Sequence, residues 1–313
     1  MTTMPPLERQ NDRVVVVTGG TGGIGFHSAL GIARTGARVI ITGRNAERGE
    51  EARQQIVASS DNPNVELVLG NVSSLAAADA LARALLERVG QRLDVLVNNA
   101  GYFGNESRTS NEGLEMHFAV NVVAPWRLTY SLLPVLRAAS GGGRVINLSA
   151  GDNPPQTPVP LNVDNLQAEK GFKGLMTMAH SKSVMEAMSM AMARELEPEG
   201  VRVNVVFPGR ASTAMTRSVA MQGLPGPMKL FYPCLKLLFM DDGGKGAAKA
   251  ARSTIWAATS AELDGVTGRY FGSDTKECTM PPKALDPKVH TRIIEAIESA
   301  GASTPNRPQR QVT

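Results

Sequence analysis

The four valines Val14–Val17 run directly into the sequence Thr18-Gly-Gly-Thr-Gly-Gly-Ile-Gly25. A β-branched run that stops at clustered glycines predicts a buried strand opening into a tight turn. A helical pattern follows from Gly25 to Thr35. Strand, glycine turn and helix in this order place free backbone N–H groups where a pyrophosphate can bind them. The segment therefore predicts a dinucleotide-binding unit at the start of the chain.

The rest of the chain alternates short apolar segments with longer amphipathic ones. Strands are predicted at Arg13–Val17, Arg38–Thr42, Val65–Leu69, Val95–Asn98, Arg144–Leu148 and Val201–Phe207. Helices are predicted at Gly25–Thr35, Ala46–Ser59, Leu75–Val89, Gly113–Ala139 and Phe172–Leu196. Such alternation favours an α/β fold with a doubly wound, Rossmann-type parallel sheet and helices on both faces. We expect one domain over residues 1–303 and a flexible polar tail over 304–313.

Composition excludes several classes of protein. The net charge of +4, from 33 basic and 29 acidic residues, comes without a basic run interleaved with aromatics, so no nucleic-acid partner is expected. The two cysteines lie far apart and the four histidines lack ligand spacing, so neither disulfides nor a metal site are expected. The first eleven residues lack the apolar stretch of a signal peptide and no apolar run reaches spanning length, which favours a cytoplasmic protein without a transmembrane segment.

Each glycine of the turn has an expected use. Gly19 permits the tight turn, Gly23 lets the backbone approach a ligand, and Gly25 lets helix and strand pack closely. The backbone of Thr21, Gly22 and Ile24 completes the predicted phosphate site.

The second predicted strand ends at Thr42-Gly43-Arg44. A carboxylate at this point would bind a ribose 2′-hydroxyl, and Gly43 offers none, whereas Arg44 could pair with a 2′-phosphate. The alternative is a solvated arginine at the start of a helix. The pattern favours NADP(H) over NAD(H).

Several further motifs resemble the short-chain dehydrogenase/reductase family. They are the turn at Thr18–Gly25, Asn98-Asn-Ala-Gly101, Asn121 within F-A-V-N-V-V-A-P, and Phe207-Pro-Gly209. The segments Asp164–Lys170 and Gly268–Phe271 resemble the retinol-dehydrogenase-like branch. The resemblance implies a sheet of about seven strands and adds cofactor-binding positions at Asn71, Val72, Asn98, Ala100, Gly101, Lys182, Pro208, Gly209 and Ser212.

The chain departs from the family at the positions that carry the chemistry. In the family a serine binds the substrate oxygen, a tyrosine exchanges its proton, and a lysine lowers the tyrosine pKa and holds the nicotinamide ribose. Aligning the motifs puts Ala150 at the serine position and Met178 at the tyrosine position, while Lys182 keeps the lysine and Asn121 the active-site asparagine. Asn71 stands where the family usually has an aspartate.

Other residues could replace the missing acid. Tyr102 follows the Asn98–Gly101 turn and Asp152 follows Ala150, so both are candidates, with a solvated loop residue as the alternative reading for each. Ser149 could serve if a one-residue bulge turned it into the site, because neighbouring strand residues point to opposite faces. His180 is a weaker candidate, since it lies about 160° around the helix from Met178 and Lys182. The pattern Tyr232-Pro-Cys-Leu-Lys236 is rejected because Pro233 disfavours a helix there.

We expect an atypical reductase of a bulky apolar substrate, with an enone, quinone or imine favoured over a simple ketone. Losing a positioned proton donor costs about 10²–10⁴ in rate, which is tolerable where the hydride acceptor stabilises its own charge. The apolar segment 208–244 is the expected substrate lid, with packing, an oligomer contact or a membrane contact as alternatives. The open alternatives are a non-redox enzyme such as a cyclase, isomerase or dehydratase, and a nucleotide-binding pseudoenzyme. A homodimer or homotetramer is compatible with the sequence.

Overall fold

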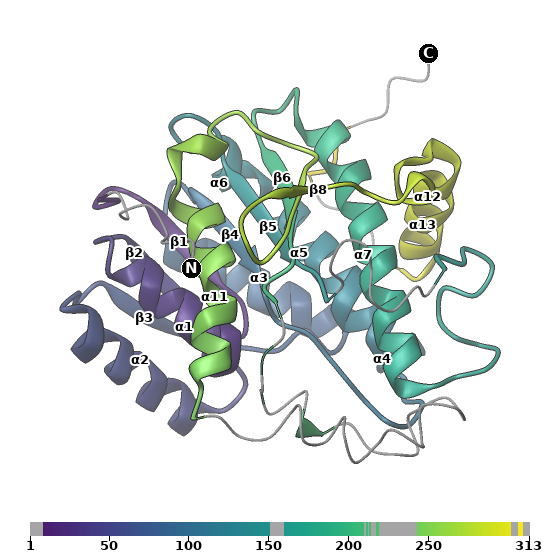
Figure 1. Ribbon diagram of the computed structural model, residues 1–313, viewed down its shortest axis with the longest axis horizontal. Helices are drawn as coiled ribbons and strands as arrows, with labels where there is room; N and C mark the ends of the chain where they lie inside the picture. Colours follow the sequence, from purple (N-terminus) through teal and green to yellow (C-terminus); the bar gives the residue numbers. More distant parts are fainter. Residues whose placement is uncertain are drawn as a thin grey trace.

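The central feature of the fold is a mainly parallel sheet. A computed structural model describes residues 9–150, 160–209, 211, 213, 217–218, 243–301 and 306–308. The described residues form an eight-stranded sheet in the order β3-β2-β1-β4-β5-β6-β7-β8 (Figure 1). Strands β1 to β7 run parallel, and only the short β8 pairs antiparallel with β7. The predicted Rossmann-type sheet is therefore confirmed, with one extra edge strand.

The strands agree closely with the sequence prediction. They are β1 Val14–Val17, β2 Arg38–Gly43, β3 Val65–Leu69, β4 Val95–Asn98, β5 Arg144–Leu148, β6 Arg202–Val206, β7 Tyr270–Phe271 and β8 Glu277–Cys278. The main helices are α1 Gly23–Ala33, α2 Ala46–Ser60, α3 Leu75–Val89, α5 Ala124–Ser131, α7 Gly174–Leu196, α11 Lys245–Thr259 and α13 Pro287–Ser299. Short helices are α4 Met116–Phe118, α6 Leu133–Arg137 and α12 Pro282–Leu285, with single turns at Ala119–Val123 and Ala261–Leu263.

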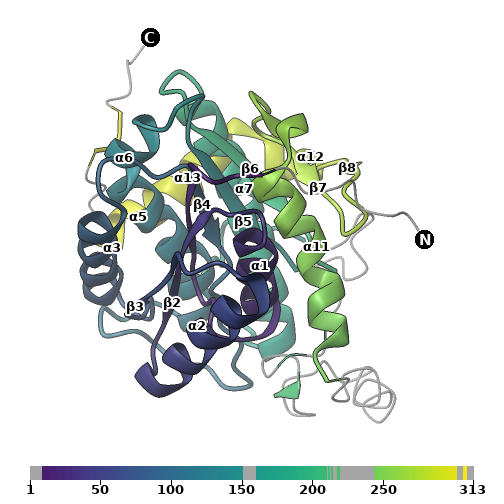
Figure 2. The ribbon, with the colours of Figure 1, turned by 90° about the vertical axis from the view of Figure 1, so that its left-hand side faces the viewer.

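The valine run of β1 explains why both faces of the sheet are covered. Val15 and Val17 pack into the core beneath α1 and α11, whereas Val16 packs into the core on the side of α3, α5 and α7. All three are 0–1% exposed, so the strand needs apolar residues at consecutive positions. Figure 2 shows the sheet lying between these two sets of helices.

The single helix predicted over Gly113–Ala139 is wrong. The chain there forms α4, a π-helical turn at Ala119–Val123, then α5 and α6. Pro125 and Pro134 each lie in the first turn of a new helix, where a missing N–H costs no hydrogen bond. The apolar periodicity continues through these breaks, which is why periodicity alone did not reveal them.

The C-terminal part adds elements that the sequence did not predict. Helices α12 and α13 pack beside α7 (Figure 1), and α11 packs against α1. Within the segment 304–313, Asn306 donates to the Tyr130 carbonyl and Arg307 contacts α7. The Arg307 guanidinium binds the carboxylates of Glu195 and Glu298 and lies 5.1 Å from the centre of the Trp126 ring.

No helix among the described residues combines the length and the apolar character needed to cross a membrane.

Candidate functional site

The site begins where the order of the strands reverses. The chain moves from β1 outward to β2 and β3, and then returns to place β4 on the other side of β1. In doubly wound sheets the crevice at the carboxyl ends of two such strands is where ligands bind. The glycine turn follows β1 at this edge and Asn98–Gly101 ends β4 beside it. Two motifs that are eighty residues apart in sequence thus become neighbours.

Hydrogen bonds join these two loops directly. Thr18 Oγ1 accepts the backbone N–H groups of Asn99 and Ala100, both at 3.0 Å, and donates to the carbonyl of Val97. Asn99 Nδ2 donates back to the Thr18 carbonyl at 2.7 Å and to that of Gly19 at 3.3 Å. These hydrogen bonds hold the glycine turn Thr18–Gly25 and the loop Asn98–Gly101 together, and the two loops are called the cradle below. Thr18 and Asn99 have this role, and sequence reasoning gave neither a site function.

The glycines of the turn have conformational and steric reasons. Gly19 and Gly23 adopt φ values of +66° and +55°, in the left-handed region that favours glycine. A Cβ at Gly25 would overlap the Gly19 carbonyl and the Asn99 side chain. The close approach at Gly25 is therefore between the start of α1 and the two loops, and any side chain there would push them apart.

The N-terminus of α1 fits a pyrophosphate. Its N-cap is Gly22, which has no side chain to accept a hydrogen bond from the first turn, and no acidic residue lies in that turn. The first N–H groups, around Gly23 and Ile24, therefore have no side-chain cap, and the helix dipole favours an anion there. By contrast, α2 and α3 are capped by the side chains of Asn45 and Ser74.

Two arginines make the neighbouring corner positive. Arg44 follows β2 and is exposed. The guanidinium of Arg48, in the first turn of α2, lies against Gly22, so any side chain at position 22 would clash with Arg48 Nη2. Gly43 is similarly packed against Thr21, so a side chain would not fit there either. Sequence reasoning found Arg44 but missed Arg48, because Arg48 lies within α2 and its contact with Gly22 is formed only in the folded chain.

The remaining cofactor candidates vary in how they face this edge. The Asn98 side chain points into the sheet, where Nδ2 donates to Asn147 Oδ1 at 2.8 Å. Asn71 Oδ1 accepts from the backbone and hydroxyl of Ser73, which fixes the loop after β3. Val72 packs partly into the core, and Gly209 adopts a φ of +95° after Pro208. Gly101 is partly exposed beside Ala100, and Ser212 lies outside the described residues.

Helix α7 supplies the catalytic lysine position. Met178 and Lys182 are one turn apart and so share a face. Lys182 Nζ donates to the carbonyl of Leu148, the last residue of β5, at 2.7 Å. Burial lowers the pKa of Lys182 to about 8, and the negative charge of Glu186 opposes this shift. The lysine is thus anchored at the end of β5, with a thioether where the family has a phenol.

The serine position is altered in an unexpected way. Ala150 is exposed just beyond β5, whereas Ser149 is 5% exposed and donates its hydroxyl hydrogen bond to the Glu186 carboxylate. Ser149 therefore points toward α7, and the bulge that would turn it into the site is not formed. Glu186 is itself 8% exposed, and burial raises its pKa to about 7. Sequence reasoning missed Glu186 because a single glutamate on a helix carries no motif.

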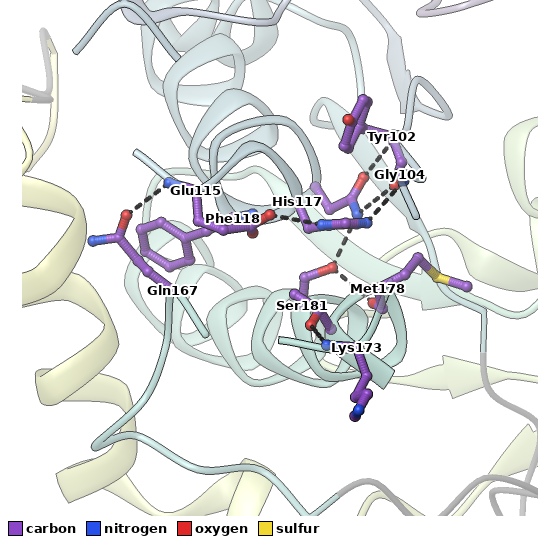
Figure 3. A network of polar contacts seen from close by, with 11 residues as sticks. Tyr102, Gly104, Glu115, His117, Phe118, Gln167, Lys173, Met178 and Ser181 are labelled. Atoms are coloured by element: carbon purple, nitrogen blue, oxygen red, sulfur yellow. Dashed lines mark hydrogen bonds and ion pairs between the residues drawn. The ribbon is translucent and has the colours of Figure 1, made fainter. Parts of the chain in front are cut away.

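Asn121 connects the loop after β4 with α7. It lies in the π-helical turn, a local geometry that often marks functional positions. Its Oδ1 accepts from Tyr102 N at 2.8 Å, and its Nδ2 donates to the Tyr102 carbonyl at 3.1 Å and to Ser181 Oγ at 2.9 Å. Ser181 in turn donates to the Met178 carbonyl at 2.7 Å (Figure 3). Asn121 thereby fixes the backbone next to Lys182.

Neither described candidate for a replacement acid is directed at Met178 and Lys182. The Tyr102 ring extends away from α7 in Figure 3, and its hydroxyl lies against Gly104. Burial raises the pKa of Tyr102. His180 Nε2 accepts the backbone N–H of Asn162 at 3.0 Å, and burial lowers its pKa. Asp152, the Tyr232–Lys236 pattern and most of the 208–244 lid lie outside the described residues.

A buried histidine holds the loop that carries Tyr102. His117 Nε2 accepts the Gly104 N–H at 3.1 Å, and Nδ1 lies 2.7 Å from Glu115 Oε1 (Figure 3). The ring is 0% exposed, so this pair stabilises the loop and does not face a ligand. Among the described residues no group of three or more histidine, cysteine or acidic side chains could hold a metal ion.

Family models and curated proteins match most of the length of this chain. Residues 13–157 match the family model described as short chain dehydrogenase, and residues 156–228 match that described as Enoyl-(Acyl carrier protein) reductase. Human retinol dehydrogenase 14 is 31% identical over 91% of this chain and 85% of its own length. Polyprenol dehydrogenase from Danio rerio is 30% identical over 93% of this chain and 87% of its own length.

Solved structures agree on the fold. The Pseudomonas aeruginosa RhlG complex with NADP is 29% identical, covers 86% of this chain and 97% of its own, and superposes with a TM-score of 0.62. An uncharacterized protein from Mycobacterium paratuberculosis superposes with a TM-score of 0.72 over 97% of this chain and 98% of its own, at 21% identity, which bears on the fold alone.

Proposed function

Because the chain belongs to the short-chain dehydrogenase/reductase family, in its retinol-dehydrogenase-like branch, we propose that it is an NADP(H)-dependent reductase that works without the family's serine and tyrosine. The observation that carries the proposal is a contrast between two parts of the molecule. The glycine turn at Thr18–Gly25 is hydrogen-bonded to the loop after β4, and Lys182 is bonded to the end of β5, while Met178 lies one turn from that lysine.

The preference for NADP(H) rests on charge at the end of β2. Gly43 offers no carboxylate to a ribose 2′-hydroxyl, Arg44 is exposed directly after β2, and Arg48 lies against Gly22 at the uncapped N-terminus of α1. Two guanidinium groups match a phosphate in charge and in hydrogen-bond geometry. The first turn of α1 would hold the pyrophosphate, and Lys182 the nicotinamide ribose. When bound, the cofactor supplies the hydride.

The chemistry follows from the missing acid. Reducing a simple ketone builds an alkoxide that requires a proton in the same step. A hydride acceptor that delocalises charge, such as an enone, a quinone or an iminium ion, yields an enolate, a hydroquinone anion or a neutral amine. These products take their proton from water after hydride transfer or need none. Residues Ala150 and Met178 present a methyl and a thioether, which suit an apolar substrate. The apolar side chains within 208–244 support a bulky one.

The test is NADPH oxidation measured with matched pairs of acceptors. We expect a large apolar enone or quinone to be reduced faster than the saturated ketone of the same skeleton, by at least about tenfold. Lys182→Ala is expected to weaken NADPH use, because it removes the cation assigned to the ribose. Lys288→Ala on α13 is the matched control, since it removes an exposed lysine on another helix.

Conversion of a substrate without any cofactor, undiminished by Lys182→Ala, would sink the reductase proposal. The same protein would then be a non-redox enzyme that uses the pocket to hold one reactive conformer. Binding of NADPH without turnover of any acceptor would instead favour a nucleotide-binding pseudoenzyme.

A further inference from the structure

A buried carboxylate lies behind the catalytic lysine and has no part in the function proposed so far. Glu186 is one turn from Lys182 on α7 and is 8% exposed. Its carboxylate accepts the hydroxyl hydrogen of Ser149, the residue next to the vacated serine position. Lys182 Nζ meanwhile donates to the Leu148 carbonyl. Consecutive residues at the end of β5 thus hold the lysine and its acidic neighbour.

We propose that Glu186 is a positioning residue for the proposed reductase: it is the counter-ion that keeps Lys182 charged in a partly buried site, and Ser149 keeps Glu186 ionised. The proposal rests on the proposed role of Lys182 in binding the cofactor. It gives Ser149 a function although Ser149 cannot act as the family's serine does.

Lys182 lies in a partly buried site. Moving an ammonium group out of water favours its neutral form, which is why the pKa of Lys182 falls to about 8. A nearby negative charge favours the ammonium form, and the charge of Glu186 acts in this direction. Burial in turn favours the neutral form of Glu186, while the Ser149 hydrogen bond and the Lys182 charge favour its carboxylate. Ser149 therefore stabilises the charged form of Glu186, and Glu186 stabilises the charged form of Lys182.

Other titratable groups on the elements packed against α7 are engaged elsewhere. Among the described residues, Glu186 is the only charged group that shifts the pKa of Lys182, and Lys182 is the only charged group that shifts the pKa of Glu186. The neighbouring groups and their partners are Arg144 on β5 with Asp264, Arg202 on β6 with the Glu197 carbonyl, His117 in α4 with Glu115, His290 on α13 with the Ala284 carbonyl, Arg292 with Asp164, and Glu298 with Arg307. Lys283 on α12 acts on His180. Asp152 lies outside the described residues.

The protonation of Lys182 sets the pH dependence of NADPH binding. In the wild type, Lys182 loses its proton as pH rises through about 8, so NADPH binding is expected to weaken above that pH. Glu186→Gln keeps the shape and removes the charge, so the pKa of Lys182 falls further and binding weakens at lower pH. A neighbouring charge moves a pKa by roughly 1–3 units. Ser149→Ala shifts the profile the same way by less, because it only favours protonation of Glu186.

The experiment is calorimetric titration of NADPH into the wild type, Glu186→Gln, Ser149→Ala and Lys182→Met between pH 6.5 and 9. We expect the alkaline limb to move down by about one pH unit in Glu186→Gln, with Kd about fivefold weaker than wild type at pH 8 and nearly equal at pH 6.5. The limb should disappear in Lys182→Met. If Glu186→Gln does not fold, Ser149→Ala, which removes one oxygen atom, decides the matter.

An alkaline limb that is unchanged in both Glu186→Gln and Ser149→Ala, or that persists in Lys182→Met, would overturn the inference while leaving NADPH binding intact. Absence of NADPH binding in the wild type would instead overturn the proposed function. A cofactor-free measurement separates the two cases. Because the folded pKa of Glu186 is raised from 4.5 to about 7, the wild type should lose stability relative to Glu186→Gln as pH rises across that interval. A constant difference would show that Glu186 is not the buried acid that the inference requires.

Discussion

Two groups of polar side chains at the carboxyl edge of the sheet are used in opposite ways. In the glycine turn and the loop after β4, Thr18 and Asn99 bond backbone groups of the neighbouring loop and so hold the two loops together. At the catalytic end, Ser149 bonds buried Glu186 and Ser181 bonds Asn121, so both hydroxyls are directed into the protein. The first arrangement prepares a surface for an anion. The second leaves only Lys182, among the family's three acid–base positions, with a polar side chain.

This difference indicates that binding and proton transfer are separable within one fold. The cradle depends on glycine conformations and loop-to-loop bonds that do not involve α7. The contacts of Asn121 and Lys182 are formed with methionine at position 178 and alanine at position 150. A fold of this kind can therefore keep its cofactor site while the reaction at the other end of the crevice changes.

The largest expected effect comes from restoring the acid. Met178→Tyr combined with Ala150→Ser places a phenol one turn from Lys182 and a hydroxyl beside it. Because a positioned proton donor contributes about 10²–10⁴ in rate, reduction of a saturated ketone by NADPH should rise by that order. The measurement is kcat/KM for the ketone. Met176→Tyr, about 160° from Met178 around α7, is the control and should give no gain. An equal gain in both variants would contradict the alignment of Met178 with the tyrosine.

A smaller effect is expected from crowding the cofactor end. Gly25→Ala places a methyl against the Gly19 carbonyl and Asn99. Overpacking of this kind costs about 1–3 kcal/mol, and if the cost falls on the cradle, NADPH affinity drops by roughly 5–150-fold. Gly90→Ala is the control, since its φ is +77° and its Cβ would meet nothing within 4 Å. It should lower Tm and leave Kd unchanged, and an equal loss of affinity there would show that the Gly25 effect is not local.

The preference between cofactors should depend on the two arginines. Arg44→Ala and Arg48→Ala should each weaken NADPH binding by about tenfold, because each removes a charge-assisted contact with the 2′-phosphate. NADH has no such phosphate, so its affinity should change little. Titration of both dinucleotides into each variant and into Lys288→Ala measures this. A parallel loss of NADH affinity would mean that the arginines support the fold of the loop and not the choice of cofactor.

The smallest effect concerns a region remote from the crevice. Arg307→Ala removes a guanidinium held by Glu195 and Glu298 over Trp126, and it should lower the free energy of unfolding by about 1–3 kcal/mol without changing NADPH affinity. Arg292→Ala breaks an exposed ion pair with Asp164, whose contribution should not exceed about 1 kcal/mol. Thermal unfolding of the two variants compares them, and equal Tm values would show that the tail is not held as described.

Much of the fold could be read from local patterns. The bounds of α3, β3, β4 and β5 were predicted to the residue, because buried parallel strands and amphipathic helices have distinct periodicities. The breaks at Pro125 and Pro134 were missed because the surrounding residues stay apolar. Helix α13 was missed although Asp286 caps it and Pro287 follows at its first position, a start signal that is present in the sequence.

The site divides in the same way. Contiguous motifs located Gly19, Gly25 and Lys182, since the loop or helix that carries them is local in sequence. Glu186 and Arg48 were missed because each contacts a residue that is distant in sequence. Ser149 is 37 residues from Glu186, and Gly22 lies in the glycine turn whereas Arg48 lies in α2. Side-chain partnerships of this kind depend on how the layers pack, which no short motif records.

The most direct test of the account is titration of NADPH and NADH into the purified wild-type protein by calorimetry near pH 7. We expect micromolar binding of NADPH and at least about tenfold weaker binding of NADH, because the uncapped N-terminus of α1 favours an anion and Arg44 and Arg48 are assigned to the 2′-phosphate. Failure of both dinucleotides to bind would contradict the central claim, and the cross-bonded glycine turn would then be a structural remnant and not a cofactor site.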